Sequence, residues 1–564
     1  MNKRMPKRLI ALLIICLMVI AVAACGKNES NSSTGPANSD GNAGNINTDS
    51  NSSNNTTNSS NEGSNTSTST SSGTPVRDTL RMAISVDFGV FDYTTVSGGH
   101  WYGMMLCLQE PLFDVVFTES GELEYVWLLA TGYDEISPTE WVLHLREGAT
   151  FSNGNPFTAE DVMFTIDNEL NGGVSSGIRA QSIDLDNSYI IDDYTISLHF
   201  TEYNVQRDIA YSDMTMFDHR TYHDTDFSTD PVGTGPYKLT EHVINSHIKM
   251  ERRDDYWGEK PQIKYLEFLV MAEPSQVVNA LQAGEIDVGD IAGQDVEFVK
   301  SLPGYTVADR TEGSWASAQF NLTDKSVMGN VDARRAFAHA INSQAIVNMV
   351  FYGYCDVMKS IVNPIVADHE ARFENIDDTY TIGYNPELAK QYAEKSGLVG
   401  KTVRIATNSA PEFILIAEII QGNLGAIGVN SEIINFDAPT FNATLRDFDI
   451  WDVGLSNGIA PNKWAGDALF MVLRTNLMIG YNPNCYWEGQ ERYHEIMPES
   501  LFNPDPKERS DVLYELQQIF ADQVLRYSIC TRVYQTAFST DLEGPFLIRV
   551  SQQRRFQDFK FKTL

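Results

Sequence analysis

Apolar residues recur with two different spacings along most of the chain. Two runs alternate with period two, namely Trp141, Leu143, Leu145 and Ile196, Leu198, Phe200. This alternation is typical of half-buried strands. Thr158 and Asp161 have the spacing of a capping box, so a helix is predicted for residues 159–170. Because strand-like and helix-like segments follow one another from Val76 onward, the pattern predicts a mixed α/β body over residues 76–564.

The amino terminus has another pattern. Four basic residues precede an uncharged apolar run of 16 residues over positions 9–24: Lys3, Arg4, Lys7 and Arg8. This layout predicts a signal peptide at residues 1–24. The run ends in small residues before Cys25 and resembles a bacterial lipobox, which implies that Cys25 is lipidated and holds the protein to the outer face of the plasma membrane. An uncleaved anchor helix is the alternative, and it also places the protein outside.

Residues 25–75 form a separate region of biased composition. After Cys25 they are mostly Ser, Asn, Thr and Gly, with almost no large apolar side chain. Such a segment cannot bury enough surface to offset the entropy of ordering, so it is predicted to be a disordered tether. A glycosylated stalk is an alternative with the same mechanical role.

The charge balance and the spacing of cysteines and histidines disfavour binding of nucleic acids, metals and cofactors. The 564 residues carry 41 basic and 75 acidic side chains, a net charge of -34, which disfavours nucleic acid as a partner. Cys107, Cys355, Cys485 and Cys530 are widely spaced and show no metal motif, and their pairing stays unassigned. The ten histidines show no ligand-like clustering, so neither a metal nor a cofactor is expected.

Several segments are similar to one known family, and over residues 141–162 the similarity is nearly position by position. The other segments are residues 193–200, 231–237, 253–261, 280–288, 320–322, 331–342 and, more weakly, 384–387 and 424–429. In these segments the chain resembles the bacterial extracellular solute-binding proteins of family 5, the oligopeptide, dipeptide and nickel type that feeds ABC importers. Asn342 stands where the family usually has aspartate. Since Asn also caps helices, Asn342 is predicted to cap a helix over residues 343–350.

Glycines in these segments carry structural predictions. Gly284 and Gly397 are expected to end helices. Gly233 and Gly235 lie in a Gly/Pro turn, where they are expected to permit positive φ.

The resemblance implies an α/β fold of the two-lobed periplasmic-binding type (type II), closing by a hinge over a ligand. Lobe I would comprise residues 76–310, with an inserted subdomain at about 105–230, and residues 530–564 would return to it. Lobe II would comprise residues 311–529. The chain crossings are expected near residues 311–319 and 529–534.

Candidate ligand-binding residues come from places where the family chain approaches its cleft. They are His100 and Trp101 in lobe I, Trp315 at the first crossing, and Trp451, Asn457 and Trp464 in lobe II. Aromatic faces and amides there would flank and orient a ligand. Residues 448–452 are predicted to be a strand, followed by a loop over residues 455–464.

Ligand identity stays open between two classes. Many peptide-binding members carry Trp-x-x-Asp-Tyr in the second-lobe loop, with the aspartate on the peptide amine; here Asn457, Gly458 and Ile459 occupy that place, and the nearest downstream carboxylate is Asp467. A peptide with a free amine therefore loses that partner. Oligosaccharides and peptides with a blocked amine become comparable candidates, whereas nickel and haem are less favoured.

Two short segments partly match motifs of enzymes. Residues 173–177 fit a nucleophile elbow but lack the preceding buried strand, and residues 397–402 have glycine spacing too short for a phosphate loop. The prediction is therefore a monomeric, non-enzymatic receptor that delivers a peptide-like or oligosaccharide ligand to an ABC permease. The alternatives are a secreted glycosidase or esterase, and a sensory lipoprotein that does not engage a permease.

Overall fold

The computed structural model describes residues 77–562 except residues 88, 95–98, 118–122, 172–179, 181, 367, 376–377, 459–468, 470–486 and 545–554. The signal peptide, Cys25 and the tether predicted for residues 1–75 lie outside the described residues. Within the described part, no helix has the length and apolar character needed to cross a membrane.

One ten-stranded mixed sheet organises both lobes, in the order β14-β13-β15-β12-β16-β11-β1-β10-β9-β8. The first-lobe strands are β1 (Thr79–Ile84), β8 (Tyr237–Val243), β9 (His247–Arg252), β10 (Tyr265–Val270) and β11 (Val288–Ile291). The second-lobe strands are β13 (Thr402–Asn408), β14 (Asn430–Phe436) and β15 (Val453–Gly458). β1 runs parallel to β10 and β11, and β13 runs parallel to β14 and β15. Each lobe therefore has an α/β centre of its own.

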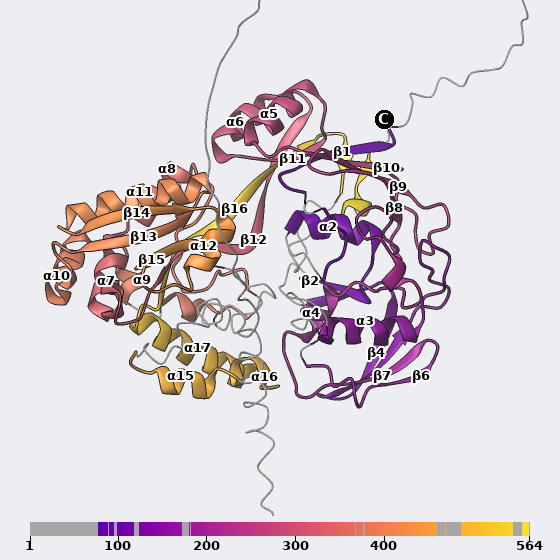
Figure 1. Cartoon of the computed structure of the whole chain (residues 1–564), viewed down its shortest axis with the longest axis horizontal. Helices are drawn as coiled ribbons and strands as arrows, with labels where there is room; N and C mark the ends of the chain where they lie inside the picture. Colours follow the sequence, from indigo (N-terminus) through magenta and orange to yellow (C-terminus); the bar gives the residue numbers. More distant parts are fainter. Residues whose placement is uncertain are drawn as a thin grey trace, which may run out of the picture. The chain divides into compact units, whose positions relative to one another are not determined.

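Two long antiparallel strands, β12 (Tyr305–Phe320) and β16 (Arg526–Ser539), connect the lobes (Figure 1). The carboxyl half of β16 pairs with β11, while the carboxyl half of β12 pairs with β15. Their register shifts between Thr311 and Trp315. The lobe limits expected at residues 310 and 529 fall inside these strands, so the chain crossings are continuous sheet and not loops.

Helices pack against the sheets and against one another, and the buried apolar residues form one large core in each lobe and a smaller third cluster around Val277, Ile291 and Val296. The first part of the chain has α2 (Gly99–Leu108), α3 (Ala159–Asn171), α4 (Arg207–Ser212), α5 (Pro274–Ala283) and α6 (Val296–Ser301). The second lobe has α7 (Val331–Ala340), α8 (Ser343–Val350), α9 (Asp378–Ile382), α10 (Pro386–Ser396), α11 (Pro411–Ala426), α12 (Ala438–Thr444), α15 (Gln490–Ile496), α16 (Glu499–Phe502) and α17 (Pro506–Asp522). Short 3-10 turns are η1 (Tyr222–Asp224), η2 (Gly293–Asp295), η3 (Val327–Gly329), η4 (Ala371–Asn375) and η5 (Phe556–Asp558).

Helix ends follow the local signals in the sequence. Gly284 and Gly397 end α5 and α10 in the left-handed conformation, as predicted. Asn342 caps α8, because its side chain accepts a hydrogen bond from the Ala345 N–H at 2.9 Å. These predictions are confirmed.

Smaller sheets lie between β1 and β8 in the sequence. They comprise β4 (Ala130–Ser137), β5 (Glu140–Leu145), β7 (Thr195–His199) and β6 (Tyr189–Asp192) in that order, and the hairpin of β2 (Phe113–Phe117) and β3 (Leu123–Trp127). A further pair, β17 (Leu542–Glu543) and β18 (Lys560–Phe561), lies near the carboxyl end. The predicted strands β5 and β7 and the predicted helix α3 are all present.

Gly233 and Gly235 are needed for a different reason from the one predicted. Neither has a positive φ, so that expectation is wrong. Instead, a Cβ on Gly233 would lie 2.2 Å from the Leu108 carbonyl oxygen, and one on Gly235 would lie 2.4 Å from the Cys107 carbonyl oxygen. The turn is therefore glycine-rich because two backbones touch there.

The strand predicted at residues 448–452 is also wrong, because this segment is a turn and the strand is β15, five residues later. The Phe448 and Trp451 carbonyls accept hydrogen bonds from the Asn321 side-chain amide, which holds the turn. The loop predicted at residues 455–464 is wrong for residues 455–458, which belong to β15, and its other residues lie outside the described part of the chain. Gly458 faces Trp315 on β12 so closely that a Cβ would lie 2.1 Å from the indole ring.

Candidate functional site

A cavity of about 500 Å³ lies where the two lobes join, within the usual size range of small-ligand sites. On the first-lobe side it is lined by residues that end or follow β1, β10 and β11: Ile84, Ser85, Met271, Ala272, Ile291 and Ala292. These strands are parallel, so their carboxyl ends meet at one edge of the sheet, the usual position of ligands in α/β folds.

The remaining walls come from the second lobe and from the connecting strands. Phe351 follows α8, and Glu412 lies in the first turn of α11, just after β13. Arg310 on β12 and residues 532–535 on β16 complete the lining. The cavity thus depends on elements from both lobes and from the strands that connect them.

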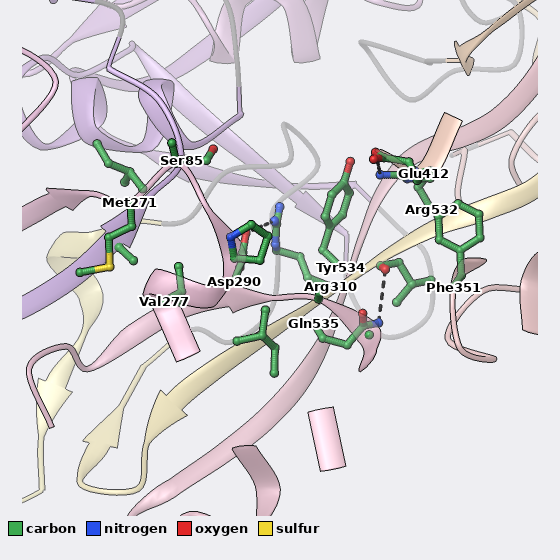
Figure 2. A pocket seen from close by; sticks show the side chains of 18 of the residues that line it. Ser85, Met271, Val277, Asp290, Arg310, Phe351, Glu412, Arg532, Tyr534 and Gln535 are labelled. Carbon is green, nitrogen blue, oxygen red and sulfur yellow. Dashed lines mark hydrogen bonds and ion pairs between the residues drawn. The ribbon is translucent and has the colours of Figure 1, made fainter. Parts of the chain in front are cut away.

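Two ion pairs are the main polar features of the cavity (Figure 2). Arg310 Nη2 donates to Asp290 Oδ2 at 2.6 Å, and Arg532 Nη2 donates to Glu412 Oε1 at 3.0 Å. The Thr536 hydroxyl also donates to Asp290. Because both arginines are buried beside carboxylates, their charge is compensated within the protein.

Aromatic rings hold the two guanidinium groups in place. Figure 2 shows Tyr534 between Arg310 and Arg532, and its ring centroid is 4.8 Å and 5.3 Å from the respective guanidinium carbons. Arg532 also lies 5.0 Å from the Phe351 ring. Cation–π contacts of this kind restrict the arginines and thereby orient their carboxylate partners.

Three of the predicted site residues, Trp315, Trp451 and Asn457, are among those that the structure describes with their side chains, and none of the three lines this cavity. Trp315 and Trp451 are fully buried in the second-lobe core. Asn457 is exposed on β15, and its carbonyl accepts a hydrogen bond from Arg526 Nη2 at 3.1 Å. Arg526 also donates to the Ser317 hydroxyl at 2.8 Å, and burial lowers the pKa of its guanidinium to about 10. A ligand-binding role for these predicted residues stays a prediction.

The remaining three predicted site residues are His100, Trp101 and Trp464. His100 and Trp101 belong to α2, but their side chains lie outside the described residues, as does all of Trp464.

Sequence reasoning missed the charged residues of the cavity. Asp290, Arg310, Glu412 and Arg532 belong to four different elements, and the partners Glu412 and Arg532 are 120 residues apart in the chain. The available signal was a charged residue in or next to each predicted crossing: Arg532 lies within residues 529–534 and Arg310 directly precedes residues 311–319. Both would be costly to bury without partners. The search for aromatic residues instead selected Trp315.

One cluster of potential metal ligands occurs among the described residues, formed by Asp161, Asp218 and His219 in lobe I. Arg220 already donates to both carboxylates, at 3.1 Å and 2.8 Å. The guanidinium therefore supplies the positive charge that a metal ion would bring. Of the cysteines, Cys107, Cys355 and Cys530 are free and buried, while Cys485 lies outside the described residues.

Comparison with known proteins agrees with this architecture. A putative ABC transporter peptide-binding protein of Brucella ovis is 26% identical over 397 residues, which cover 66% of this chain and 73% of the relative. The crystal structure of the ABC transporter substrate binding protein CtaP from Listeria monocytogenes superposes with a TM-score of 0.74 at 19% identity, over 86% of this chain and 99% of that one. The structure of DppA from Helicobacter pylori in complex with peptide STSA gives a TM-score of 0.70 at 18% identity, over 86% and 99% of the two chains.

These structures share the two-lobed fold of periplasmic binding proteins. A family model for the middle part of such proteins matches residues 124–472, more than half of the chain. The chain belongs to the bacterial extracellular solute-binding proteins of family 5.

Proposed function

We propose that this protein is a lipid-anchored receptor of an ABC importer that binds peptide-like ligands in the cavity between its lobes and passes them unchanged to a permease. The observation that carries this proposal is the cavity itself, because a ligand there would contact both lobes and both connecting strands. A ligand that contacts both lobes stabilises their closed arrangement, which a permease can recognise.

Peptides are favoured over oligosaccharides by the polar groups of the cavity. The two partly exposed carboxylates offer acceptors suited to amide N–H and terminal ammonium groups, whereas the aromatic faces of Tyr534 and Phe351 are covered by arginines. Relatives named as peptide-binding proteins support the same choice.

A binding screen tests the ligand class. The full-length protein is incubated with mixtures of free di- to pentapeptides or with neutral oligosaccharides, and bound molecules are identified by native mass spectrometry and by the rise in melting temperature. Stoichiometric retention of intact peptides is expected. Binding of sugars alone would refute the peptide assignment, and hydrolysis products would favour a secreted hydrolase instead.

The anchor is tested separately at Cys25. Replacing Cys25 by Ala should move the protein from the membrane fraction to the medium, and mass spectrometry of the wild-type amino terminus should find a diacylated cysteine. A wild-type protein that is found in the medium without lipid would contradict this part of the proposal. Light scattering is expected to find a monomer.

A further inference from the structure

The cavity presents carboxylates and hides guanidinium groups. In the pair of Asp290 with Arg310, the side chains are 28% and 5% exposed; in the pair of Glu412 with Arg532, they are 30% and 10% exposed. In both pairs the acid is the accessible partner. The charge that an entering ligand meets first is therefore negative, although the four side chains together are neutral.

Glu412 has one oxygen available for a ligand. Its Oε1 accepts from Arg532, whereas Oε2 receives no hydrogen bond from any residue that the structure describes. Arg532 cannot easily turn to serve this second oxygen or to reach into the cavity, because Phe351, Tyr534 and Phe413 surround its guanidinium within 6.0 Å of each ring centroid. The arginine thus fixes Glu412, a residue that lines the cavity, through one carboxylate oxygen only.

Asp290 faces the same cavity from the other lobe. It lies on β11, while Glu412 lies on α11, and both line the cavity (Figure 2). A positively charged group bound by Glu412 would also be attracted by Asp290, because both carboxylates line the same cavity.

The geometry points to Glu412 as the residue that binds the ammonium group of the ligand, with Asp290 as a supporting charge. The ligand class is then a peptide-like molecule with a free primary amine. This inference rests on the proposed function and deepens it. Glu412 in α11 would provide the carboxylate for the ligand amine. The second-lobe segment that holds an aspartate in many peptide-binding members has Asn457, Gly458 and Ile459 here.

The test compares a free and a blocked amine on the same peptide. The tightest-binding peptide of the screen is synthesised with a free and with an N-acetylated amino terminus, and both are titrated calorimetrically into the full-length wild type and into Glu412→Gln. Acetylation should weaken wild-type binding roughly 10- to 100-fold, the range of a charge-assisted hydrogen bond. E412Q should weaken binding of the free peptide by a similar factor and leave the acetylated peptide unchanged. Glu412→Asp should restore part of the discrimination.

Glu387→Gln is the matched control. Glu387 follows Pro386 in the first turn of α10 just as Glu412 follows Pro411 in α11, but it is exposed and lies outside the cavity. E387Q removes the same helix-dipole contact and should bind both peptides as the wild type does.

The outcomes separate the two proposals. If no peptide binds the wild type, the proposed function fails. If peptides bind but acetylation has no effect on the wild type, or E412Q weakens both forms equally, peptide binding stands and the amine assignment to Glu412 is overturned. The wild-type comparison tests the free-amine class without any variant, and Glu412→Asp tests the assignment to this residue if E412Q does not fold.

Discussion

Glu110 is expected to make the protein less stable as the pH rises from 4.5 to 7. The side chain is only 1% exposed and follows α2 in the first lobe. Its Oε1 accepts a hydrogen bond from the Tyr256 hydroxyl at 2.6 Å, and Oε2 has no partner among the residues that the structure describes. Burial raises the pKa of Glu110 from 4.5 to about 7, because desolvation outweighs the hydrogen bond from Tyr256 and the charge of Arg555.

The sign and size of the effect follow from proton linkage. Below pH 4.5 the carboxyl is protonated in both the folded and unfolded states, and it contributes no pH dependence. Between pH 4.5 and about 7 the unfolded state releases the proton while the folded state keeps it, so the free energy of unfolding falls. At about 1.4 kcal/mol per pH unit, the full loss is about 3 kcal/mol.

Glu110→Gln should remove this dependence, since the amide keeps an acceptor for Tyr256 and does not ionise. Urea unfolding of wild type and E110Q at pH 4.5 and pH 8 gives a double difference in which other titrating groups cancel. E110Q should gain about 3 kcal/mol relative to wild type between the two pH values. Glu285→Gln, at an exposed carboxylate after α5, is the control substitution for the loss of one acidic side chain. A double difference near zero for E110Q would refute the reasoning.

Three further experiments test the packing of the core and the contact between the lobes. Gly458→Ala should destabilise the second lobe by about 1–3 kcal/mol in urea unfolding and alter Trp315 fluorescence, because the new Cβ would overlap the indole. Gly422→Ala is the control: it lies at an exposed site in α11 with open space around it and should be neutral or stabilising. Labelling of Cys107 by iodoacetamide at pH 8 should require unfolding, because burial raises the pKa of its thiol; fast labelling of the native protein would contradict this. Tyr203→Ala should weaken the contact between lobes and lower ligand affinity, as titration calorimetry would show.

Local structure was predictable where the signal is local. The alternation around Trp141 and the capping residue Asn342 each act within a few positions, so β5 and the start of α8 were found correctly. The strand β15 was missed because its glycines resemble loop residues. Only the neighbouring strand β12, distant in sequence, shows that Gly458 is small to admit Trp315.

The lining of the cavity could not be predicted in the same way. Asp290 and Arg310 are close in sequence, but Glu412 and Arg532 meet across 120 residues. Each is unremarkable alone in a chain with 75 acidic residues, and only the pairing across the sheet makes it a candidate. Family resemblance located the connecting strands near Arg310 and Arg532, which shows that segments can be predicted where individual contacts cannot.

A second contact between the lobes suggests how closure is set independently of the ligand. Val205, between β7 and α4, donates its N–H to the Leu501 carbonyl of α16 at 2.9 Å and packs into the second-lobe core. The nearby Tyr203 ring lies 5.2 Å from Arg207 and 5.8 Å from Arg509 of α17. This contact does not include the cavity lining, so it can favour the closed arrangement without touching a ligand.

The two contributions can be separated by their ligand dependence. Weakening closure lowers the fraction of binding-competent protein, which reduces the apparent affinity for every ligand by one common factor. Tyr203→Ala should therefore weaken free and N-acetylated peptides equally, whereas Glu412→Gln should weaken only the free form. Calorimetric titration of both peptides into both variants measures the two factors, and small-angle scattering of the ligand-free proteins should find Y203A more open than E412Q. Discrimination between the two peptides in Y203A that differs from wild type would mean that the distal contact also shapes the cavity.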